Sequence, residues 1–581
     1  MCSTLRSLFL LIIFLNTNTI VSAQDCRPEA FYNLNVNNVN ARINTGGDLF
    51  FDGANGTYEV SADATSPSAI FLSGLWMGGK DSSDNLHLAA QSYGRSEGNF
   101  DYVPGPLDSD GSFSGNCNDW DQVFTVTRED VDIMREFANN NVYPIPIDQI
   151  PLSILGWPGS GNPYFESVHG FPLPNSNSGL APFWDTYLIG YYNPASGSYP
   201  LFLGDEASWT VMHDAAVYAD GGTSGDSQIK METQVLAYAY NSENTDLSNT
   251  TFYEYKFIYH GEETLSDFYY GQFIDTDLGC SQNDLMGTAP DNDLIYFYND
   301  ADNPEYLNCE GEESYGTQNP VNTFRVLSSR IYDDTVMLNQ GLQRAIAYSP
   351  LPSDVLAGVS LPTTPEQRYL ALTGHWRDGT PLTAGGNGYN PGSTDEVDFI
   401  YSGNYDTNYE WSLCNEPGSR TQGDLAVYSF GPLLLRPGAV NKFTVGITTF
   451  FDGSYLDGCV DLDNVLTGSD EIQTYYQGQV DSIYIANGEI SSTQEVISPE
   501  KIGLQVYPNP ASETIQFKLP ETATSSIINL RVLNLTGQTV AEHLVNTDQI
   551  QLNRENLPAG IYLYQLLLAN GKTVSGRLVW Q

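Results

Sequence analysis

The fold class of this chain is decided by residues 231–261, METQVLAYAYNSENTDLSNTTFYEYKFIYHG. β-Branched and aromatic residues dominate both ends of the stretch and polar residues fill its middle, so it predicts two long strands around a turn. The alternating aromatic residues of Tyr253–Tyr259 favour packing in a core over stacking platforms for sugars. A third strand is predicted directly afterwards, in YYGQFIDTD at 269–277.

The same strand-and-turn pattern extends over most of the chain. LAVYSFGPLLL at 425–435 and NKFTVGITTFF at 441–451 predict further strands, and Gly, Pro, Asn and Ser fill the gaps. Pro144–Gly204 is rich in Pro, Gly and Asn, which predicts a long irregular excursion. The predicted fold class is mostly β: multidomain β-sandwiches with long irregular loops, ending in a small Ig-like β-sandwich.

Helix signals are few, and the best lies in VTREDVDIMREFANN, Val126–Asn140. Thr127 is a natural N-cap, and Val131, Met134 and Phe137 recur on one face of the predicted helix.

Charge limits the classes of partner. The chain has 581 residues with 23 Lys and Arg against 71 Asp and Glu, a formal net charge of -48. Such a surface repels phosphate backbones and anionic lipid, so we expect no nucleic-acid partner. Cations and neutral glycans fit it better, although the charge also suits a protein that merely has to stay soluble outside the cell.

The N-terminus predicts export. Arg6 provides a positive charge, Leu8–Leu15 an apolar run, and small residues precede a cleavage site between Ala23 and Gln24. The apolar run is too short to span a bilayer, and no later segment predicts a transmembrane helix.

Six cysteines remain after such a cleavage. In an oxidising compartment six cysteines permit three disulfides and 15 connectivities, of which we favour Cys280–Cys309, because these two flank one acidic segment. Buried free thiols are the alternative. The six are Cys26, Cys117, Cys280, Cys309, Cys414 and Cys459.

The acidic segment 275–294, DTDLGCSQNDLMGTAPDNDL, is the candidate metal site. Asp275, Asp277 and Asp284 offer several of the oxygens that calcium requires, and Gly279 permits a sharp bend. Alternatively, these aspartates cap turns at a strand end without any metal. Calcium is the one cofactor that the sequence suggests.

No catalytic residue is assigned from the sequence. Gly94–Gly98, GRSEG, matches the G-x-S-x-G pattern of hydrolases, but the residues that follow cannot continue as a helix and no histidine is assignable as a base. Paired carboxylates, as in glycosidases, are uninformative among so many acidic residues.

The C-terminal stretch VYPNPASETIQFKL, Val506–Leu519, alternates like a strand but contains two prolines. Since proline cannot donate to a sheet ladder, Pro508 and Pro510 are expected outside the paired residues. Thr536-Gly537 and Asn570-Gly571 predict turns between further strands.

The order of four motifs in this tail resembles the type A C-terminal sorting domain of bacterial type IX secretion substrates. The motif residues that carry the resemblance include Tyr507, Pro508, Asn509, Pro510, Gly537, Gly560 and Tyr562, within YPNPA, VLNLTG, LPAGIY and RLV. The resemblance implies passage through an outer-membrane translocon that binds the tail. It also implies removal of the tail, leaving the mature protein secreted or on the outer cell surface.

Five segments follow from these observations. Residues 1–23 are a predicted signal peptide, 24–229 an N-terminal β-rich cargo region with one short helix and the long excursion, and 230–486 a β-sandwich cargo region. Residues 487–502 lack any hydrophobic periodicity and form a predicted linker, and 503–581 form the sorting domain.

The cargo resembles large uncharacterised secreted surface proteins that carry the same tail, which implies no particular activity. The resemblance rests on NNVNARINTGGDLFF, SGLWMGGKDSSDNLHLAAQSYG, YVPGPLD, CNDWDQVFTVTREDV, WRDGTPLTAGGNGY and GPLLLRPGAVNKFTVGI. In those proteins the frame at Ala181–Pro200 leads into a calcium-type loop. Here Tyr187 and Ile189 replace oxygen ligands and Asp185 is the one obvious carboxylate, so we predict no calcium there and packing by Tyr187, Ile189 and Tyr191 instead.

The sequence thus predicts an exported surface protein whose cargo is an adhesin or a glycan- or protein-binding module. A secreted, glycosidase-like hydrolase and a structural envelope protein are the alternatives.

Overall fold

The computed structural model describes most of the chain from Cys26 to Trp580. The described residues are 26–60, 67–113, 115–140, 142–174, 180–184, 191–214, 228–279, 284–299, 315, 320–334, 336–338, 341–348, 358–403, 411–413, 416, 425–451, 454–456, 459–487, 496–497, 504–518, 527–533, 539–544, 549–554, 557–558, 560–568 and 573–580. Signal-cleavage residues Ala23 and Gln24 lie outside them. Within them, no helix is long and apolar enough to cross a membrane.

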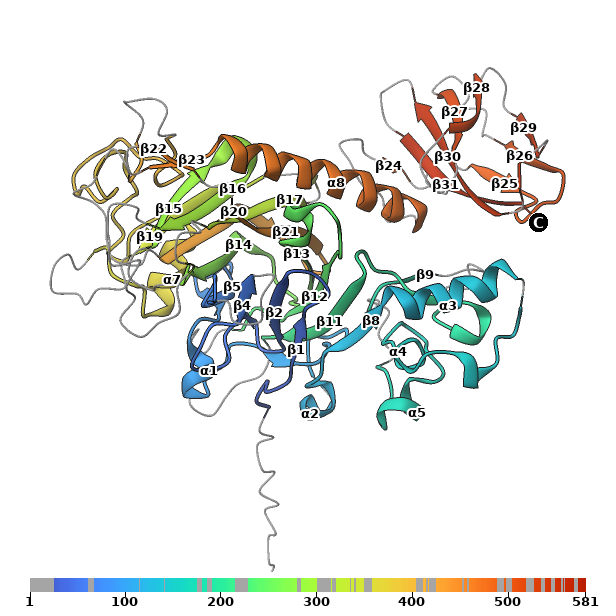
Figure 1. Cartoon of the computed structure of the whole chain (residues 1–581), viewed down its shortest axis with the longest axis horizontal. Helices are drawn as coiled ribbons and strands as arrows, with labels where there is room; N and C mark the ends of the chain where they lie inside the picture. The colour runs from blue at the N-terminus through green and yellow to red at the C-terminus, as the bar shows by residue number, and fades with distance from the viewer. Residues whose placement is uncertain are drawn as a thin grey trace, which may run out of the picture.

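Two large antiparallel sheets form the body of the cargo (Figure 1), and two small two-stranded sheets, β10-β9 and β22-β23, are added to them. The first has the order β1-β2-β3-β5-β14-β20-β19, with β4 beside β2 and β6 beside β5. Its strands are β1 (Phe31–Leu34), β2 (Val39–Asn44), β3 (Asp48–Leu49), β4 (Tyr58–Val60), β5 (Leu72–Lys80), β6 (Leu86–Ala90), β14 (Leu265–Asp275), β19 (Arg344–Tyr348) and β20 (Leu425–Leu435).

The second sheet has the order β15-β16-β17-β21-β13-β12-β11-β7, with β18 beside β17 and β8 beside β11. Its strands are β7 (Val103–Pro104), β8 (Phe124–Thr127), β11 (Glu206–His213), β12 (Met231–Ala239), β13 (Thr250–Tyr259), β15 (Asp284–Ala289), β16 (Leu294–Asn299), β17 (Val321–Asp333), β18 (Val336–Leu338) and β21 (Val440–Phe450).

β12 and β13 lie at the centre of the cargo because successive side chains along each strand point alternately to its two faces, and both faces are buried. The two pair in register from Met231↔Tyr259 to Ala239↔Thr251, as the sequence predicted, and the polar turn between them contains the short helix α6 (Thr245–Ser248). Tyr253 and every second residue to Tyr259 pack into the core between the sheets, which confirms their predicted packing role. Phe252 points to the opposite face and a second core.

Strands from both sides of residue 230, the expected boundary between two cargo regions, share the same sheets. β11 and β12 pair across it along their length, and the core between the sheets draws residues from Leu34 to Val465. The predicted third strand, β14, crosses to the first sheet, where it pairs with β5 and β20.

The outer face of the second sheet is covered by the irregular excursion and by the long helix α8 (Asp463–Asn487) (Figure 1). Predicted helix Val126–Asn140 is α3 (Arg128–Asn139), and Thr127 is its N-cap within a capping box. The remaining short elements are α1 (Gly94–Glu97), α2 (Cys117–Trp120), η1 (Ile147–Gln149), α4 (Leu152–Leu155), α5 (Phe165–His169), β9 (Phe183–Trp184), η2 (Pro194–Ser196), β10 (Tyr199–Pro200), η3 (Pro290–Asn292), α7 (Pro365–Leu372), β22 (Ser454–Leu456) and β23 (Cys459–Asp461).

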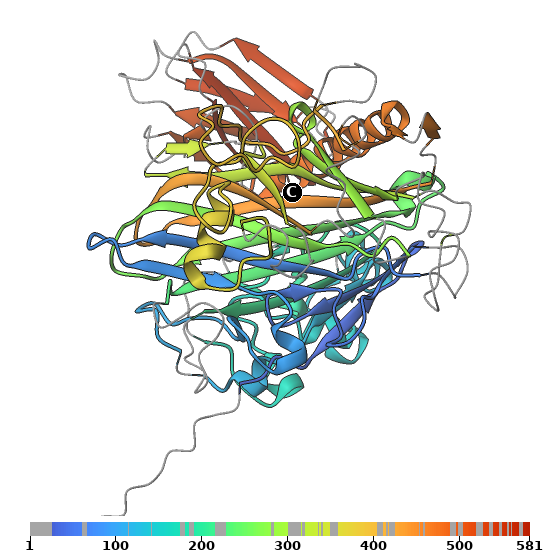
Figure 2. The same ribbon diagram turned by 90° about the vertical axis from the view of Figure 1, so that its left-hand side faces the viewer.

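The tail forms its own small sandwich beyond α8 (Figure 2). Two sheets, β24-β31-β30-β27-β28 and β25-β26-β29, enclose a third core that contains Phe517, Val532, Leu578 and Trp580. Its strands are β24 (Val496–Ile497), β25 (Gln505–Tyr507), β26 (Thr514–Lys518), β27 (Ile527–Leu533), β28 (Thr539–Leu544), β29 (Gln549–Asn553), β30 (Gly560–Leu568) and β31 (Thr573–Trp580). The predicted fold class, mostly β with a β-sandwich at the C-terminus, is confirmed.

Candidate functional site

The first tail motif, YPNPA at 507–511, is hydrogen-bonded to β31, the last strand of the tail. Asn509 Oδ1 accepts a hydrogen bond from the backbone N–H of Val579 at 2.8 Å, and the N–H of Ala511 donates to the Val579 carbonyl at 2.9 Å. Pro508 and Pro510 lie in the turn between β25 and β26, outside the paired residues, as predicted from their missing donors.

The third motif, LPAGIY at 557–562, places its tyrosine in the tail core. Tyr562 is buried in the tail core, and its hydroxyl donates to the carbonyl of Pro558 at 3.1 Å. Gly560 begins β30 opposite Trp580. The expected turn at Gly537 lies outside the described residues.

One disulfide is present in the described part of the chain, between Cys26 and Cys117, whose Cα atoms are 5.5 Å apart. It ties the first described residue to α2. The predicted Cys280–Cys309 bond lies outside the described residues and stays a prediction.

Of the three aspartates of the candidate calcium site, Asp275 ends β14, Asp284 begins β15 and Asp277 lies between them in the chain. Tyr93 donates a hydrogen bond to Asp275 Oδ2 at 2.6 Å, and burial raises the pKa of the Asp275 carboxyl to about 7. Asp284 is completely buried, and burial followed by the charges of Asp277 and Asp275 holds the pKa of its carboxyl well above the usual range. Burial removes water from a carboxyl group and so disfavours its charged form, which raises its pKa.

Two buried oxygen atoms at this place have no partner among the described residues. Asp284 and Asn299 face each other across β15 and β16. Asp284 Oδ2 accepts from the N–H of Leu278 at 3.2 Å and Asn299 Nδ2 donates to the Leu278 carbonyl at 3.2 Å, which leaves Oδ1 of both residues unpaired. Among the described residues, however, no three His, Cys, Asp or Glu side chains converge as a metal ligand set.

The loop after Ala181-Pro-Phe183 does not pack as predicted in the part that is described. Tyr191 is 46% exposed, whereas its neighbour Tyr192 is fully buried and donates a hydrogen bond to the carbonyl of Ile154 at 2.7 Å. The prediction is therefore wrong for Tyr191, because the following residue provides the anchor. Asp185, Tyr187 and Ile189 lie outside the described residues.

The G-x-S-x-G segment, Gly94–Gly98, has a structural role in the fold. It forms the one-turn helix α1, in which Arg95 makes a two-pronged ion pair with buried Asp48 at 2.7 and 2.8 Å. The Ser96 hydroxyl donates to the carbonyl of Tyr93 within the same turn. The Ser96 hydroxyl therefore stabilises a local turn.

A buried polar cluster on the outer face of the second sheet was not predicted. His213 and Glu232 face each other across β11 and β12, and His260 Nε2 lies 3.6 Å from Glu232 Oε2. Burial, followed by the charge of His260, lowers the pKa of His213 to about 3, so its ring is neutral at neutral pH. The ring packs on Phe113 at 4.7 Å, as expected for a histidine with a packing role.

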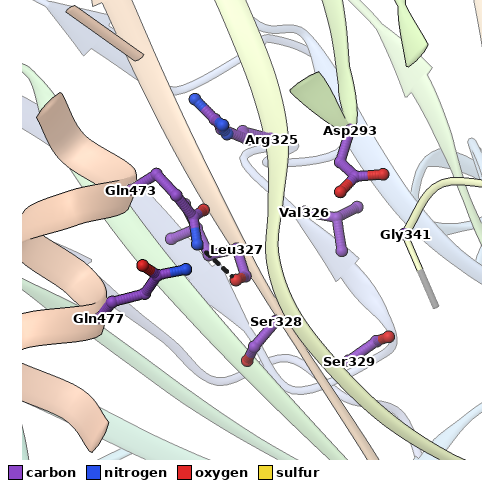
Figure 3. A pocket seen from close by; sticks show the side chains of 9 residues that line it. All are labelled: Asp293, Arg325, Val326, Leu327, Ser328, Ser329, Gly341, Gln473 and Gln477. Atoms are coloured by element: carbon purple, nitrogen blue, oxygen red, sulfur yellow. Dashed lines mark hydrogen bonds between the residues drawn. The ribbon is translucent and has the colours of Figure 1, made fainter. Parts of the chain in front are cut away.

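A polar pocket of about 250 Å³ lies between β17 and α8 (Figure 3). It lies beside a register shift in the pairing of β17 with β21, where Leu327 falls between the paired residues Val326 and Ser328. The Leu327 carbonyl accepts a hydrogen bond from Gln473 Nε2 at 2.9 Å. Bulges commonly occur beside functional sites, where they redirect the chain.

The pocket holds both hydrogen-bond donors and acceptors. Arg325 binds Asp470 Oδ1 at 2.7 Å through Nη1, while its Nε has no hydrogen-bond partner among the described residues. Asp293 Oδ1 accepts from the N–H of Leu342 at 2.9 Å, and burial raises the pKa of this carboxyl. Any side chain at Gly341 would collide with Asp293, since a Cβ would lie 1.7 Å from Oδ1.

A second, more open hollow of about 530 Å³ lies on the other flank of α8. It is lined by Asn244, Thr467, Asp470, Glu471, Thr474 and Tyr475. At 100° per residue, Gln473 and Gln477 fall on one side of Asp470 and the residues of the second hollow on the other. The Arg325–Asp470 ion pair therefore links the two hollows. Sequence reasoning missed both, because α8 itself was not predicted.

Comparisons with known proteins give little on the cargo. No curated protein matches the chain. A solved polysaccharide lyase is 9% identical with a TM-score of 0.18; the alignment covers 63% of this chain and 36% of the lyase, and a likeness this weak carries no argument.

The tail gives a definite answer. Residues 505–581 match the family described as the secretion system C-terminal sorting domain. Such a tail directs export and an extracellular or outer-surface location once it has been removed, and it implies interaction with the type IX machinery. The chain is therefore a type IX secretion substrate that carries a type A sorting domain at its C-terminal end.

Proposed function

We propose that the cargo is a surface binding protein that recognises glycans along α8. The observation that carries this proposal is the pair of hollows on the two flanks of α8, the first with mostly polar and the second with mostly apolar lining, joined by the Arg325–Asp470 ion pair. An extended ligand could occupy both hollows while lying across the helix. Such a site suits a chain of repeating polar units better than a compact small molecule.

The lining groups match sugar hydroxyls. Each hydroxyl both donates and accepts, and the first hollow offers the Asp293 carboxylate and the Gln473 and Gln477 amides. In the second hollow, Tyr475 supplies an aromatic ring, held edge-on against Tyr240 at 5.1 Å. Aromatic rings beside amides and carboxylates are a common means of fixing a sugar ring.

Charge selects the kind of glycan. Asp293, Asp470 and Glu471 line the two hollows, and the one cation among the lining residues, Arg325, already pairs with Asp470. A uronic-acid polymer would therefore meet uncompensated repulsion. The proposed ligand class is a neutral or amino-substituted glycan.

Titration calorimetry after a glycan-array screen tests this proposal on residues 24–581. We expect Gln477→Ala and Tyr475→Ala each to weaken binding of the array hit about 10-fold, since each removes a single polar or stacking contact. Gln479→Ala is the matched control, because it lies on the same helix outside both hollows. Equal binding by all three variants, or no array hit among neutral glycans, would contradict the proposal. Release of oligosaccharides in a parallel degradation assay would favour the hydrolase alternative.

We also propose that calcium binds beside Asp284. The support is the pair of unpaired, buried Oδ1 atoms of Asp284 and Asn299 next to Asp275 and Asp277, since hard cations prefer carboxylate and amide oxygens. Calcium titration calorimetry and a thermal-shift assay should show one binding event that is lost in Asp284→Asn. Asp291→Asn is the matched control, because Asp291 is exposed in η3. No heat of binding in the unsubstituted chain would refute the proposal.

A further inference from the structure

Three basic side chains form a row across neighbouring strands of the second sheet, β13, β21 and β17 (Figure 1). Lys256 on β13 lies opposite Lys442 on β21, and Arg330 on β17 lies opposite the same lysine. Residues directly opposite each other in an antiparallel pair share one face of the sheet. The residue after each of the three is buried in the core between the sheets, so this basic row lies on the outer face. All three side chains are partly exposed.

The basic row is unexpected in so acidic a chain. Acidic residues outnumber basic ones by 71 to 23, and like charges directly opposite each other in a sheet repel. Lys442 Nζ lies 3.7 Å from Oε1 of the buried Glu254, which offsets part of the positive charge. Placing cations side by side costs the fold stability, whereas an anion bound across the row would be attracted to all three of them.

A row of exposed apolar side chains lies next to the basic row. Tyr332 follows Arg330 by two residues along β17, and Val440 precedes Lys442 by two residues along β21, so both lie on the same outer face. Met337 pairs with Tyr332 from β18. The exposed fractions are 37% for Tyr332, 40% for Val440 and 43% for Met337, and we call these three side chains the apolar row.

On its other side the basic row meets hydroxyl groups that hold α8 on the sheet. The Tyr476 hydroxyl is hydrogen-bonded to the hydroxyls of Ser328 at 2.7 Å and of Thr444 at 3.1 Å. Ser328 and Thr444 lie two residues from the basic row on β17 and β21. Along these strands the outer face therefore changes from hydroxyl groups to cations and then to exposed apolar side chains.

We propose that the basic and apolar rows bind an anionic amphiphile, a molecule with a phosphate head and an apolar body. The phosphate lies across the basic row, where the fork of Arg330 binds two of its oxygens and the two lysines add charge. A doubly charged phosphate matches three cations better than a singly charged carboxylate does. The apolar body covers the apolar row, whose burial adds to the binding free energy.

The ligand is a single molecule and not a membrane, because the formal charge of -48 repels an anionic bilayer surface. Neither row contributes a residue to the two hollows beside α8, so this site does not depend on the proposed glycan binding.

Titration calorimetry of residues 24–581 with octyl phosphate, below its micelle concentration, tests the proposal. Octyl tetraethylene glycol ether has the same tail without the charge, and inorganic phosphate has the head without the tail. We expect each to bind at least about 10-fold more weakly than octyl phosphate, since each lacks one of the two contacts.

Variants assign the two contacts to the two rows. Arg330→Gln and Lys256→Gln should each weaken octyl phosphate about 10-fold, because each removes a charge-assisted hydrogen bond. Met337→Ser should weaken octyl phosphate about 5-fold and leave inorganic phosphate unchanged. Lys80→Gln is the matched control, since Lys80 is a partly exposed lysine of the first sheet. Lys442 is kept, because its loss would leave the Glu254 carboxylate buried without this cation.

Thermal unfolding separates binding from folding. Because like charges repel across the strands, Arg330→Gln and Lys256→Gln should unfold at the same temperature as the unsubstituted chain or at a higher one. A lower unfolding temperature in both variants would make the basic row structural and overturn the proposal. No heat of binding with octyl phosphate would also overturn it, as would unchanged affinity in Arg330→Gln and Lys256→Gln or equal affinity for the uncharged amphiphile.

Discussion

The cargo and the tail are both built from facing antiparallel sheets, but their sheets are assembled over different sequence distances. In the cargo, β13 pairs with β21, so that Thr250 lies opposite Thr448, and β5 pairs with β14, so that Leu72 lies opposite Asp275. In the tail, Gly560 lies opposite Trp580 and Ile515 opposite Leu552. Local pairing leaves its pattern in a short window of sequence, whereas long-range pairing does not.

The two regions also differ in what a partner would meet on them. Residues 503–581 contain five basic and five acidic residues and so have no formal net charge, whereas the cargo carries the acidic charge and has two hollows beside α8. The tail serves export, and the proposed glycan site lies in the cargo. The predictions below compare these two regions.

The largest expected effect concerns export. Residues 503–581 fused to a periplasmic reporter should send it through the type IX route, and their deletion from this chain should leave the cargo in the periplasm. Mass spectrometry of the extracellular fraction measures both, with the reporter alone as control. Peptides ending at Gln581 on most surface copies would contradict removal of the tail.

The next effect is on the stability of the cargo alone. Replacing Cys26 and Cys117 by alanine opens a loop with a sequence separation of 91 residues. In the chain-entropy model this lowers the free energy of unfolding of the cargo by about 4–5 kcal/mol. Calorimetry should show the cargo transition at lower temperature and the tail transition unchanged; a shift of both would mean that the two regions unfold together. Non-reducing peptide mapping of the same sample tests the predicted Cys280–Cys309 bond.

A smaller effect is the response of the cargo to acid. In the unfolded chain His213 gains a proton near pH 6.5, but in the fold its pKa is about 3. The unfolded state therefore binds more protons between these values, and stability falls as the pH drops through this window, by up to about 1.4 kcal/mol per pH unit. Urea unfolding at pH 6.5 and 4.5 should show that the free energy of unfolding depends less steeply on pH in His213→Gln than in the unsubstituted chain.

His375→Gln is the control for this comparison, because His375 lies at the surface of the cargo. Burial raises the pKa of Asp214 to about 6, so this residue makes the fold more stable as the pH falls, opposite to His213. Asp214 is present in all the variants, so its contribution cancels when their pH dependences are compared. If the free energy of unfolding had the same pH dependence in the unsubstituted chain and in His213→Gln, the pKa of His213 would not be lowered in the fold.

The smallest effect is at the N-terminus of α3. Thr127→Ala removes the hydroxyl that accepts from the N–H of Asp130, which should cost about 1 kcal/mol of cargo stability. Thr127→Ser keeps the acceptor and should cost less. Urea unfolding followed by circular dichroism measures both, and a loss above about 3 kcal/mol would mean that Thr127 does more than cap the helix.

Comparison of α3 with α8 shows why one helix was predicted and the other was not. α3 has an N-cap, acidic residues in its first turn and a regular apolar face with Val131 and Met134 buried. In residues 463–479, whose burial is described, α8 buries Val465, Ile472 and Tyr476 among few others, and it contains two glycines, so its apolar pattern is sparse. Its position depends on the second sheet, which supplies the surface on which it lies.

The sequence by itself determined the features whose physical cause is local. These are the strands around residues 231–261, the cap at Thr127, the turn prolines at 508 and 510, and the sorting domain, since alternation, capping and missing donors each act within a few residues. Only the tertiary structure decided that both cargo regions share two sheets, that Cys26 binds Cys117 and that Arg325 meets Asp470 beside a pocket. Those contacts join residues about 100 or more positions apart, and the free energy that selects them comes from burying one common core, which no short window of sequence contains.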